Sequence, residues 1–409
     1  MSTTISRAFT LFLATLTGCQ AAAAGGAPAV ARIEPLPATS STVAAPARGE
    51  VAFAAALPAL ALTVAAAPAS EAPPQLAAPA ACDAAPAALG FYGFYASDAW
   101  AQGNVVLTFD DGPIASATPR VLDQLAARGM QATFFLVGRN ISRTTYPLVQ
   151  RMVAAGHTLG SHSYSHDVHM THVGAPKETI EIIRSQHEAT AILIDIALLA
   201  RSGDDFDAMV RRVFDTDPAR WMSPSTIRKG WRAALARHRT MLEERGLPPG
   251  QRPYDVLYSR PPGGGPYVEH DGAAGVALHD AALKELGMVN VLWHGASGDT
   301  IPGQRRDRAS LTANMNRQAR RGGVLLIHDH IRGDALAASL REIDADPALQ
   351  VMSLDQAVQR KYACAAGGLR AKLGRGAARA ASLQVLLGDP TPAPARPEPA
   401  LAAVAALAR

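Results

Sequence analysis

Two pairs of reactive side chains stand directly after short apolar runs of this chain. Asp110 and Asp111 follow one run and precede a Gly-Pro pair, whereas His162 and His166 follow another. A turn after the aspartates lets both carboxylates face one cavity, where they resist ionising together unless a cation lies beside them. Histidines four residues apart lie on the same face of a helical turn, as metal chelation requires.

Two histidines and one of the two aspartates make up a common catalytic zinc set, which leaves an open position for water. A catalytic metal lowers the pKa of its bound water from about 15.7 towards about 7. Hydrolysis also needs a base that takes the water's proton and an acid that protonates the departing amine. Whichever aspartate stays off the metal is free to act as the base.

Three further apolar runs end in residues that could complete this chemistry. His328 follows the run 324–327 and is the natural acid. Arg260 follows the run 256–259 and can pair with the base carboxylate, which keeps that carboxylate ionised. The backbone N–H of Gly263 could donate to an oxyanion beside the metal.

Short apolar runs bounded by turn formers predict buried parallel strands, here at 104–109, 131–137, 157–161, 254–259, 288–293 and 323–327. Amphipathic stretches between them predict helices near 118–128 and 144–155, from Pro176, near 271–286 and 308–321, and on to about 361. Strands that alternate with helices predict an α/β barrel or a large open sheet, with the chemistry at the carboxyl ends of the strands.

Residues 200–252 interrupt this alternation with a polar, arginine-rich block. Met209, Val210, Val213 and Phe214 recur at helical spacing, so part of the block is expected to pack against the core. We interpret it as a helical surface insertion. The alternative is a lid or a basic wall that helps to select the substrate.

Four short motifs occur in one order across 104–361: TFDDGP at 108–113, HSYSH at 162–166, RPPG at 260–263 and LIHD at 326–329. As a set they resemble the polysaccharide deacetylase family, which is carbohydrate esterase family 4 with the NodB-homology domain. The resemblance implies a deformed (β/α) barrel over 98–365 that uses a divalent metal to remove acetyl groups from N-acetylated sugars. Zinc is the expected ion, with cobalt or nickel as alternatives.

The resemblance also assigns roles by motif position. Asp110 corresponds to the base and His328 to the acid, whereas the metal ligands correspond to Asp111, His162 and His166. Asp299 would tune His328, and Leu326 would line a pocket for the acetyl methyl group.

Three positions depart from the family's usual pattern. Gly263 stands where an aromatic residue is common, Thr300 replaces a usual Trp, and His294 stands where an acidic residue is frequent. Two other hypotheses therefore stay open. One is O-acetyl ester hydrolysis on a glycan by the same machinery, and the other is a catalytically silent glycan-binding lipoprotein.

The ends of the chain indicate export. Residues 1–19 resemble a signal peptide that ends in a lipobox (LTGC), so Cys19 would carry lipid. Together with Gln20 this predicts an outer-membrane lipoprotein that faces the periplasm; the alternative is a soluble periplasmic or secreted protein. The Ala/Pro-rich segments 20–97 and 366–409 predict a disordered tether and tail.

Cys82 lies before the predicted domain and Cys364 lies just after its last predicted helix, and the two could form a disulfide in an oxidising compartment. The tail 367–409 carries six basic and two acidic residues, which account for the whole formal charge of +4. A formally neutral remainder argues against nucleic acid as a partner. An acetylated glycan, either peptidoglycan or an exopolysaccharide, is the expected substrate, and the sequence does not indicate an oligomeric state.

Overall fold

The computed structural model describes residues 90–91, 99–172, 174–218, 222–268, 272–303, 305, 307–363 and 369. The predicted signal peptide, Cys19, Cys82, Cys364 and most of the predicted tether and tail lie outside these residues. Within the described part of the chain, no helix combines the length and the hydropathy that crossing a membrane requires.

Nine strands of the described residues form one parallel sheet in the order β1-β6-β5-β4-β3-β2-β8-β7, with β9 beside β2. The strands are β1 (Gly90–Phe91), β2 (Asn104–Asp110), β3 (Thr133–Leu136), β4 (Thr158–Ser161), β5 (Tyr258–Ser259), β6 (Val289–Val291), β7 (Gly295–Ala296), β8 (Gly323–His328) and β9 (Gln350–Val351). Each run that the sequence predicts as a strand overlaps one of them. The strand β1 falls inside the segment assigned to the tether.

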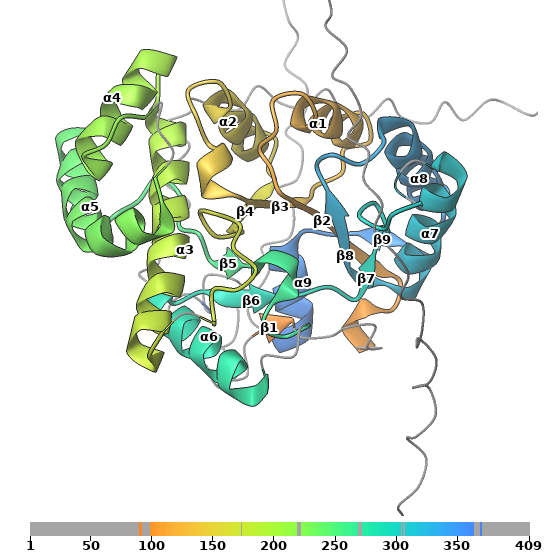
Figure 1. Cartoon of the computed structure of the whole chain (residues 1–409). Coiled ribbons are helices and arrows are strands. Elements are labelled where there is room, and N and C mark those ends of the chain that lie inside the picture. The colour runs from red at the N-terminus through yellow and green to blue at the C-terminus, as the bar shows by residue number, and fades with distance from the viewer. Residues whose placement is uncertain are drawn as a thin grey trace, which may run out of the picture. The chain divides into compact units, whose positions relative to one another are not determined.

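The sheet curls into an incomplete barrel whose edge strands are β1 and β7 (Figure 1). Its shape confirms the predicted deformed (β/α) barrel. The helices around the sheet are α1 (Thr118–Ala126), α2 (Tyr146–Ala154), α3 (Pro176–Leu199), α6 (Gly272–Leu286), α7 (Arg308–Arg321) and α8 (Gly333–Ala345). The helix α9 (Leu354–Tyr362) instead packs its buried residues together with residues of β5, β6 and β8.

Alternation along β2 decides which of its side chains reach the interior of the barrel. Val105, Leu107 and Phe109 belong to the core that is shared with the surrounding helices, whereas Val106 belongs to a second core together with residues of β5, β6 and β8. Because strand side chains alternate between faces, Asp110 lies on the same face as Val106. The last residue of β2 therefore brings its carboxylate into the barrel.

Two helices form the insertion that the sequence predicts, α4 (Gly203–Phe214) and α5 (Pro224–Glu244), and both pack against α3 (Figure 1). Each begins at a serine, Ser202 or Ser223, whose side chain accepts a hydrogen bond from a backbone N–H of the first turn. Met209, Val210 and Val213 are buried and Phe214 is partly buried, as their spacing predicts. This cover explains why the 24-residue helix α3 is buried along most of its length.

Candidate metal centre and catalytic site

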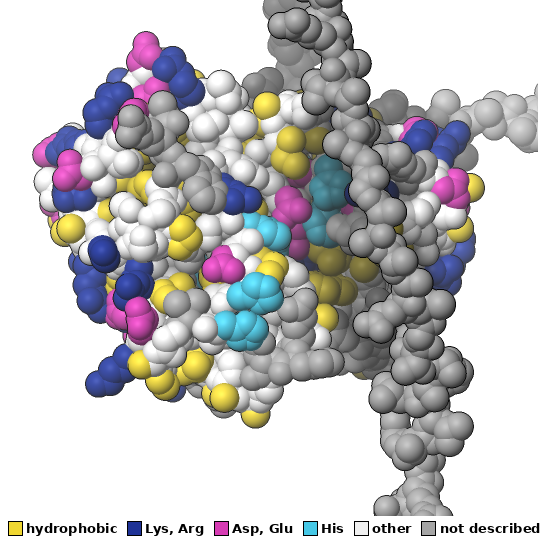
Figure 2. Space-filling view, viewed as in Figure 1, with side chains coloured by type: hydrophobic (Ala, Val, Ile, Leu, Met, Phe, Trp, Pro, Cys, Tyr) yellow, Lys and Arg dark blue, Asp and Glu magenta, His cyan; other side chains and the backbone are white. Residues whose placement is uncertain are grey.

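The strand register gathers the predicted residues at one edge of the barrel. Asp110 of β2 is paired directly with His328 of β8. The strands β4 and β5 pair at their last residues, so His162 and Arg260, which follow them, leave the sheet as neighbours. Figure 2 shows histidine and acidic side chains gathered near the middle of this face.

Asp111, His162 and His166 bring three ligand-type atoms within 4.8 Å of one another. The Oδ1 atom of Asp111 lies 3.1 Å from His166 Nε2 and 3.6 Å from His162 Nε2. Although His166 is near, this buried oxygen accepts no well-aligned hydrogen bond from the residues that the structure describes. A buried carboxylate oxygen without a donor, with two imidazole nitrogens beside it, fits the oxygen and nitrogen donors that a zinc ion takes.

The orientation of His162 supports this fit. Its Nδ1 lies 2.8 Å from the backbone carbonyl oxygen of Arg260. Because a carbonyl only accepts hydrogen bonds, Nδ1 carries the proton and the lone pair is on Nε2, which faces Asp111. Burial lowers the pKa of His162, which favours the neutral imidazole that a metal ligand must be.

His162 and His166 do not share a helical turn, so that part of the sequence-based prediction is wrong. The strand β4 ends one residue before His162, and the chain up to His166 is irregular, with φ of 62° at Ser163 and 56° at His166. The side-chain oxygen of Gln186 in α3 accepts hydrogen bonds from two backbone N–H groups of this loop, at 2.9 and 3.1 Å. Tertiary contacts therefore hold His166 beside Asp111.

Asp110 and Arg260 form a buried ion pair, with Arg260 Nη1 at 2.7 Å from Asp110 Oδ1. Arg260 also donates to Thr108 Oγ1 and to two backbone carbonyl groups at the end of β6, and its guanidinium lies 4.2 Å from the centre of the Phe135 ring. The other oxygen of Asp110 lies 3.6 Å from His162 Nε2. Arg260 thus fixes one oxygen and leaves the second facing the metal centre.

His328 is held by Asp299 from the loop that follows β7. The ring Nδ1 lies 2.8 Å from Asp299 Oδ1, and the backbone N–H of His328 donates to Asp299 Oδ2 over 2.8 Å. Burial by itself would lower the pKa of His328, but the hydrogen bond and the charge of Asp299 outweigh it and raise that pKa to about 9. The ring therefore carries a proton on both nitrogens, and hence a positive charge, at neutral pH.

Gly263 and Leu326 border this site. Gly263 is exposed in a short 3₁₀ turn, η4 (Pro262–Gly264), with φ of 62°, a conformation that glycine adopts without strain. A Cβ at Gly263 would come 3.3 Å from Val168, which lies two residues beyond His166. Leu326 is nearly buried on the same face of β8 as His328, two residues before it.

Asp329 is a buried carboxyl group that the sequence analysis does not single out, although it adjoins His328. It is fully buried and accepts a hydrogen bond from the Thr118 hydroxyl, while its backbone N–H donates to the Asp110 carbonyl over 3.1 Å. Gly112 lies so close that a Cβ there would overlap the Asp329 carboxyl. Burial raises the pKa of Asp329 to about 7.

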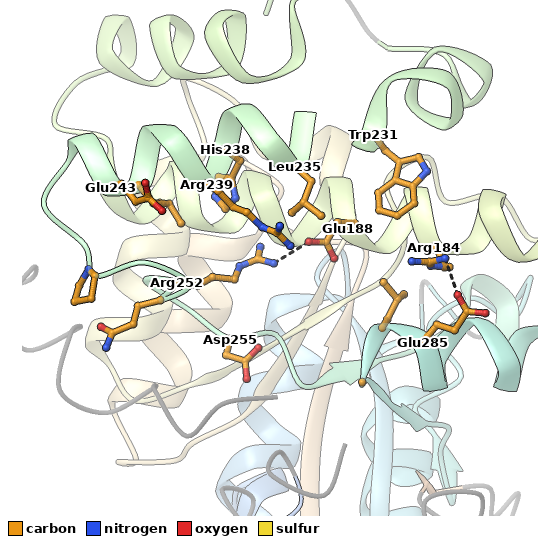
Figure 3. Close-up of a pocket in the computed structure, with 16 residues that line it drawn as sticks. Arg184, Glu188, Trp231, Leu235, His238, Arg239, Glu243, Arg252, Asp255 and Glu285 are labelled. Carbon is orange, nitrogen blue, oxygen red and sulfur yellow. Dashed lines mark hydrogen bonds and ion pairs between the residues drawn. The ribbon is translucent and has the colours of Figure 1, made fainter. Parts of the chain in front are cut away.

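The insertion lines a separate cavity of about 650 Å³ between α3, α5 and the segment 248–255 (Figure 3). Asp255 and Gly287 line it just before β5 and β6 begin, so it lies at the end of these strands opposite to the metal centre. In the wall of this cavity Arg252 forms an ion pair with Glu188, with Nη1 and Oε1 3.0 Å apart. The insertion also contacts the loop between His162 and His166, because the backbone N–H of Met222 donates a hydrogen bond to the Tyr164 hydroxyl over 3.2 Å.

Comparisons with known proteins identify the family. The family model for polysaccharide deacetylase matches residues 99–197. A peptidoglycan-N-acetylglucosamine deacetylase of Bacillus cereus is 42% identical over 76 residues, which are 18% of this chain and 27% of that protein. A bifunctional xylanase/deacetylase of Pseudobutyrivibrio xylanivorans is 44% identical over 93 residues, which are 23% of this chain and 14% of that protein. The matches thus cover less than a third of the length of these two relatives.

Among solved structures, the peptidoglycan deacetylase PdaC of Bacillus subtilis aligns with 64% of this chain and 92% of its own, with 22% sequence identity and a TM-score of 0.40. The matched segment 99–197 contains Asp110, Asp111, His162 and His166, and the barrel continues beyond it to the strands that carry Arg260 and His328. The chain therefore carries a polysaccharide deacetylase domain of the NodB-like, carbohydrate esterase family 4 kind.

Proposed function

We propose that this chain is a metal-dependent deacetylase that removes N-acetyl groups from an extracytoplasmic polysaccharide. The observation that carries the proposal is the convergence of three features on one barrel edge. They are the metal-ligand set, an aspartate held by Arg260 and a histidine held by Asp299. A protein that only binds glycans has no need for a fixed base, an acid with a raised pKa and a metal-ligand set together.

Asp111, His162 and His166 would hold the ion, for which zinc is our first choice, and cobalt or nickel accept the same donors. When bound, the ion would polarise the acetyl carbonyl and lower the pKa of a coordinated water. The backbone N–H of Gly263 would donate to the carbonyl oxygen as it gains charge. Leu326 would flank the acetyl methyl group.

The chain's own residues would move the protons. The free oxygen of Asp110 would accept the proton of the attacking water, and Arg260 would keep this carboxylate ionised and aimed. His328 would give the proton on Nε2 to the departing nitrogen, because Asp299 holds its Nδ1. Acetate and a free amino sugar would leave.

Amino sugars of peptidoglycan or of an exopolysaccharide are the proposed substrate. The expected export of the chain supports this choice, because these are polymers that an exported enzyme meets. The Bacillus cereus relative, a peptidoglycan-N-acetylglucosamine deacetylase, supports the same choice.

The direct test is to measure acetate released from N-acetylglucosamine oligomers, peptidoglycan and O-acetylated xylan, with and without a chelator. We expect chelation to stop release and Asp110→Asn to lower its rate by about 10²–10⁴-fold with the fold unchanged by circular dichroism. Full activity of Asp110→Asn would refute the assigned base. Release from xylan alone would identify an ester hydrolase, and no release with metal bound would identify a glycan-binding protein.

We also propose that Cys19 anchors the chain to the outer membrane. Labelling with radioactive palmitate, in a Gram-negative host, should mark the full chain and fail to mark Cys19→Ser. Equal labelling of both would place the lipid on another residue and refute the role of Cys19, whereas labelling of neither would leave a soluble periplasmic or secreted protein instead.

A further inference from the structure

A second group of ligand-type side chains adjoins the catalytic site. Asp299, His328 and His330 each offer an atom, and these atoms lie within 4.8 Å of one another. The rings of His328 and His330 stack with their centroids 5.2 Å apart and an interplanar angle of 27°. Two imidazoles and one carboxylate are the same donor set that Asp111 completes at the metal centre.

An ion could reach this second group from solvent. His330 is exposed, and in the described part of the chain its ring has no hydrogen-bonding partner that would hold it in place. A cavity of about 270 Å³ opens beside it and is lined also by Asp299 and Thr300. Because the His330 ring is exposed, it is free to rotate towards the geometry of a zinc site, where ligand atoms lie about 2.0–2.2 Å from the ion.

We propose that Asp299, His328 and His330 form a second, weaker zinc site whose occupancy blocks the hydrolysis. The blocking rests on the proposed function, whereas the binding does not. Arg305 also lines the cavity, and its positive charge opposes a dication, so the second ion should bind less tightly than the first. The remaining ligand positions would be filled by water or a small anion.

Binding of the second ion would change the protonation state of His328. Coordination uses a ring lone pair, so the ion displaces one proton from the imidazole into solvent. The ring is then a neutral imidazole, and the one N–H that it keeps is a far weaker acid than an imidazolium, so it gives its proton poorly to a departing nitrogen. Because the ligands Asp111, His162 and His166 are not involved, the first ion would stay bound while the acid is blocked, and kcat would fall with little change in KM.

The test is a zinc titration of the full, tag-free chain after chelator treatment, against a chromophoric chelator that reports free zinc. We expect two ions per chain, the second at least about tenfold weaker, and a single ion in His330→Gln. Acetate release should reach a plateau at one equivalent of zinc and fall at least tenfold as the second ion binds. In His330→Gln the plateau should persist, because this exposed residue is not part of the hydrolytic machinery.

The matched control is His169→Gln, which alters an exposed histidine that stacks on His172 with centroids 5.2 Å apart. It should keep both ions and the inhibition. One ion in the unchanged chain, retention of the second ion by His330→Gln, or its loss in the control would overturn the proposal. If the chain binds two ions and His330→Gln binds one, but no acetate is released at any zinc level, the second site is supported. The hydrolytic function is then refuted instead.

Discussion

Asp299 uses both of its carboxylate oxygens on one residue, His328, accepting one hydrogen bond from the ring Nδ1 and one from the backbone N–H, each over 2.8 Å. These two hydrogen bonds fix the orientation of the His328 ring, and the contact with Asp299 raises the pKa of that ring to about 9. The carboxylate is nearly buried, with 2% of its surface exposed, so solvent screens this interaction weakly.

Asp299→Asn should move the alkaline limb of the pH–rate profile downward. An acid must be protonated to act, so activity is retained below the pKa of His328 and lost as the pH rises through it. Without the carboxylate charge, that pKa should fall from about 9 towards about 6.5, a shift of roughly two pH units. The measurement is kcat against pH. Asp307→Asn, which alters an exposed N-cap of α7, is the control and should leave the limb in place.

Arg260→Met should destabilise the fold by about 3–5 kcal/mol, because it leaves the Asp110 carboxylate buried without its partner. Urea denaturation measures the loss. The double variant with Asp110→Asn should regain part of it, since the uncompensated charge is then gone. Arg332→Met, which breaks an exposed pair with Asp334, should lower the free energy of unfolding far less, because solvent screens an exposed ion pair. Equal losses at the two arginines would contradict the view that burial makes the Arg260 pair important.

Gln186→Leu should weaken zinc binding by about 10–100-fold, although the hydrogen bonds that Gln186 accepts come from the loop and not from a proposed metal ligand. Its side-chain oxygen accepts the hydrogen bonds that hold the loop between His162 and His166. Competition with a chelator measures the affinity. Gln150→Leu is a matched control, because Gln150 also caps two backbone groups, the carbonyls of Ala197 and Ala200, away from the centre. Unchanged zinc affinity in Gln186→Leu would show that the loop holds its shape without this clamp.

Asp329→Asn should change how stability depends on pH. The folded-state pKa of about 7 lies above the ordinary 3.8, so the unfolded chain loses this proton first and stability falls as the pH rises from about 4 to about 7. An amide cannot ionise, so this loss is absent from the variant. Across that window its free energy of unfolding should therefore rise relative to that of the unchanged chain, by up to about 4 kcal/mol. Urea denaturation of chelator-treated protein at pH 4, 5.5 and 7 measures the difference. A constant difference would mean that Asp329 does not titrate there.

Several features of the site could be predicted from local sequence. The runs before Asp110 and His328 are continuous because β2 and β8 are buried almost throughout, and such runs are recognisable without a structure. The Gly-Pro turn and the clustering of reactive residues at strand ends likewise depend on neighbours in the chain. The helical insertion was predictable for the same reason, since the burial of Met209 and Val213 follows the helical period.

Other features depend on contacts between distant segments. The spacing of His162 and His166 indicates a helical turn, yet the loop adopts positive φ angles because Gln186, from another element, binds its backbone. Asp329 is ionisable by type, but its burial in the folded chain raises its pKa, although the hydrogen bond from Thr118 acts in the opposite direction. No local pattern encodes the 2.8 Å approach of Asp299, from the loop after β7, to His328 at the end of β8.

The amino-acid sequence by itself determined the alternation of strands and helices, and hence which residues stand at strand ends, because hydrophobic periodicity and turn chemistry act over a few residues. The tertiary structure decided the rest: which carboxylate oxygen faces the metal centre, which imidazole nitrogen keeps its lone pair, and which ionisable groups change their pKa. These properties depend on distances of a few ångströms between segments far apart in the chain, and only the folded barrel sets those distances.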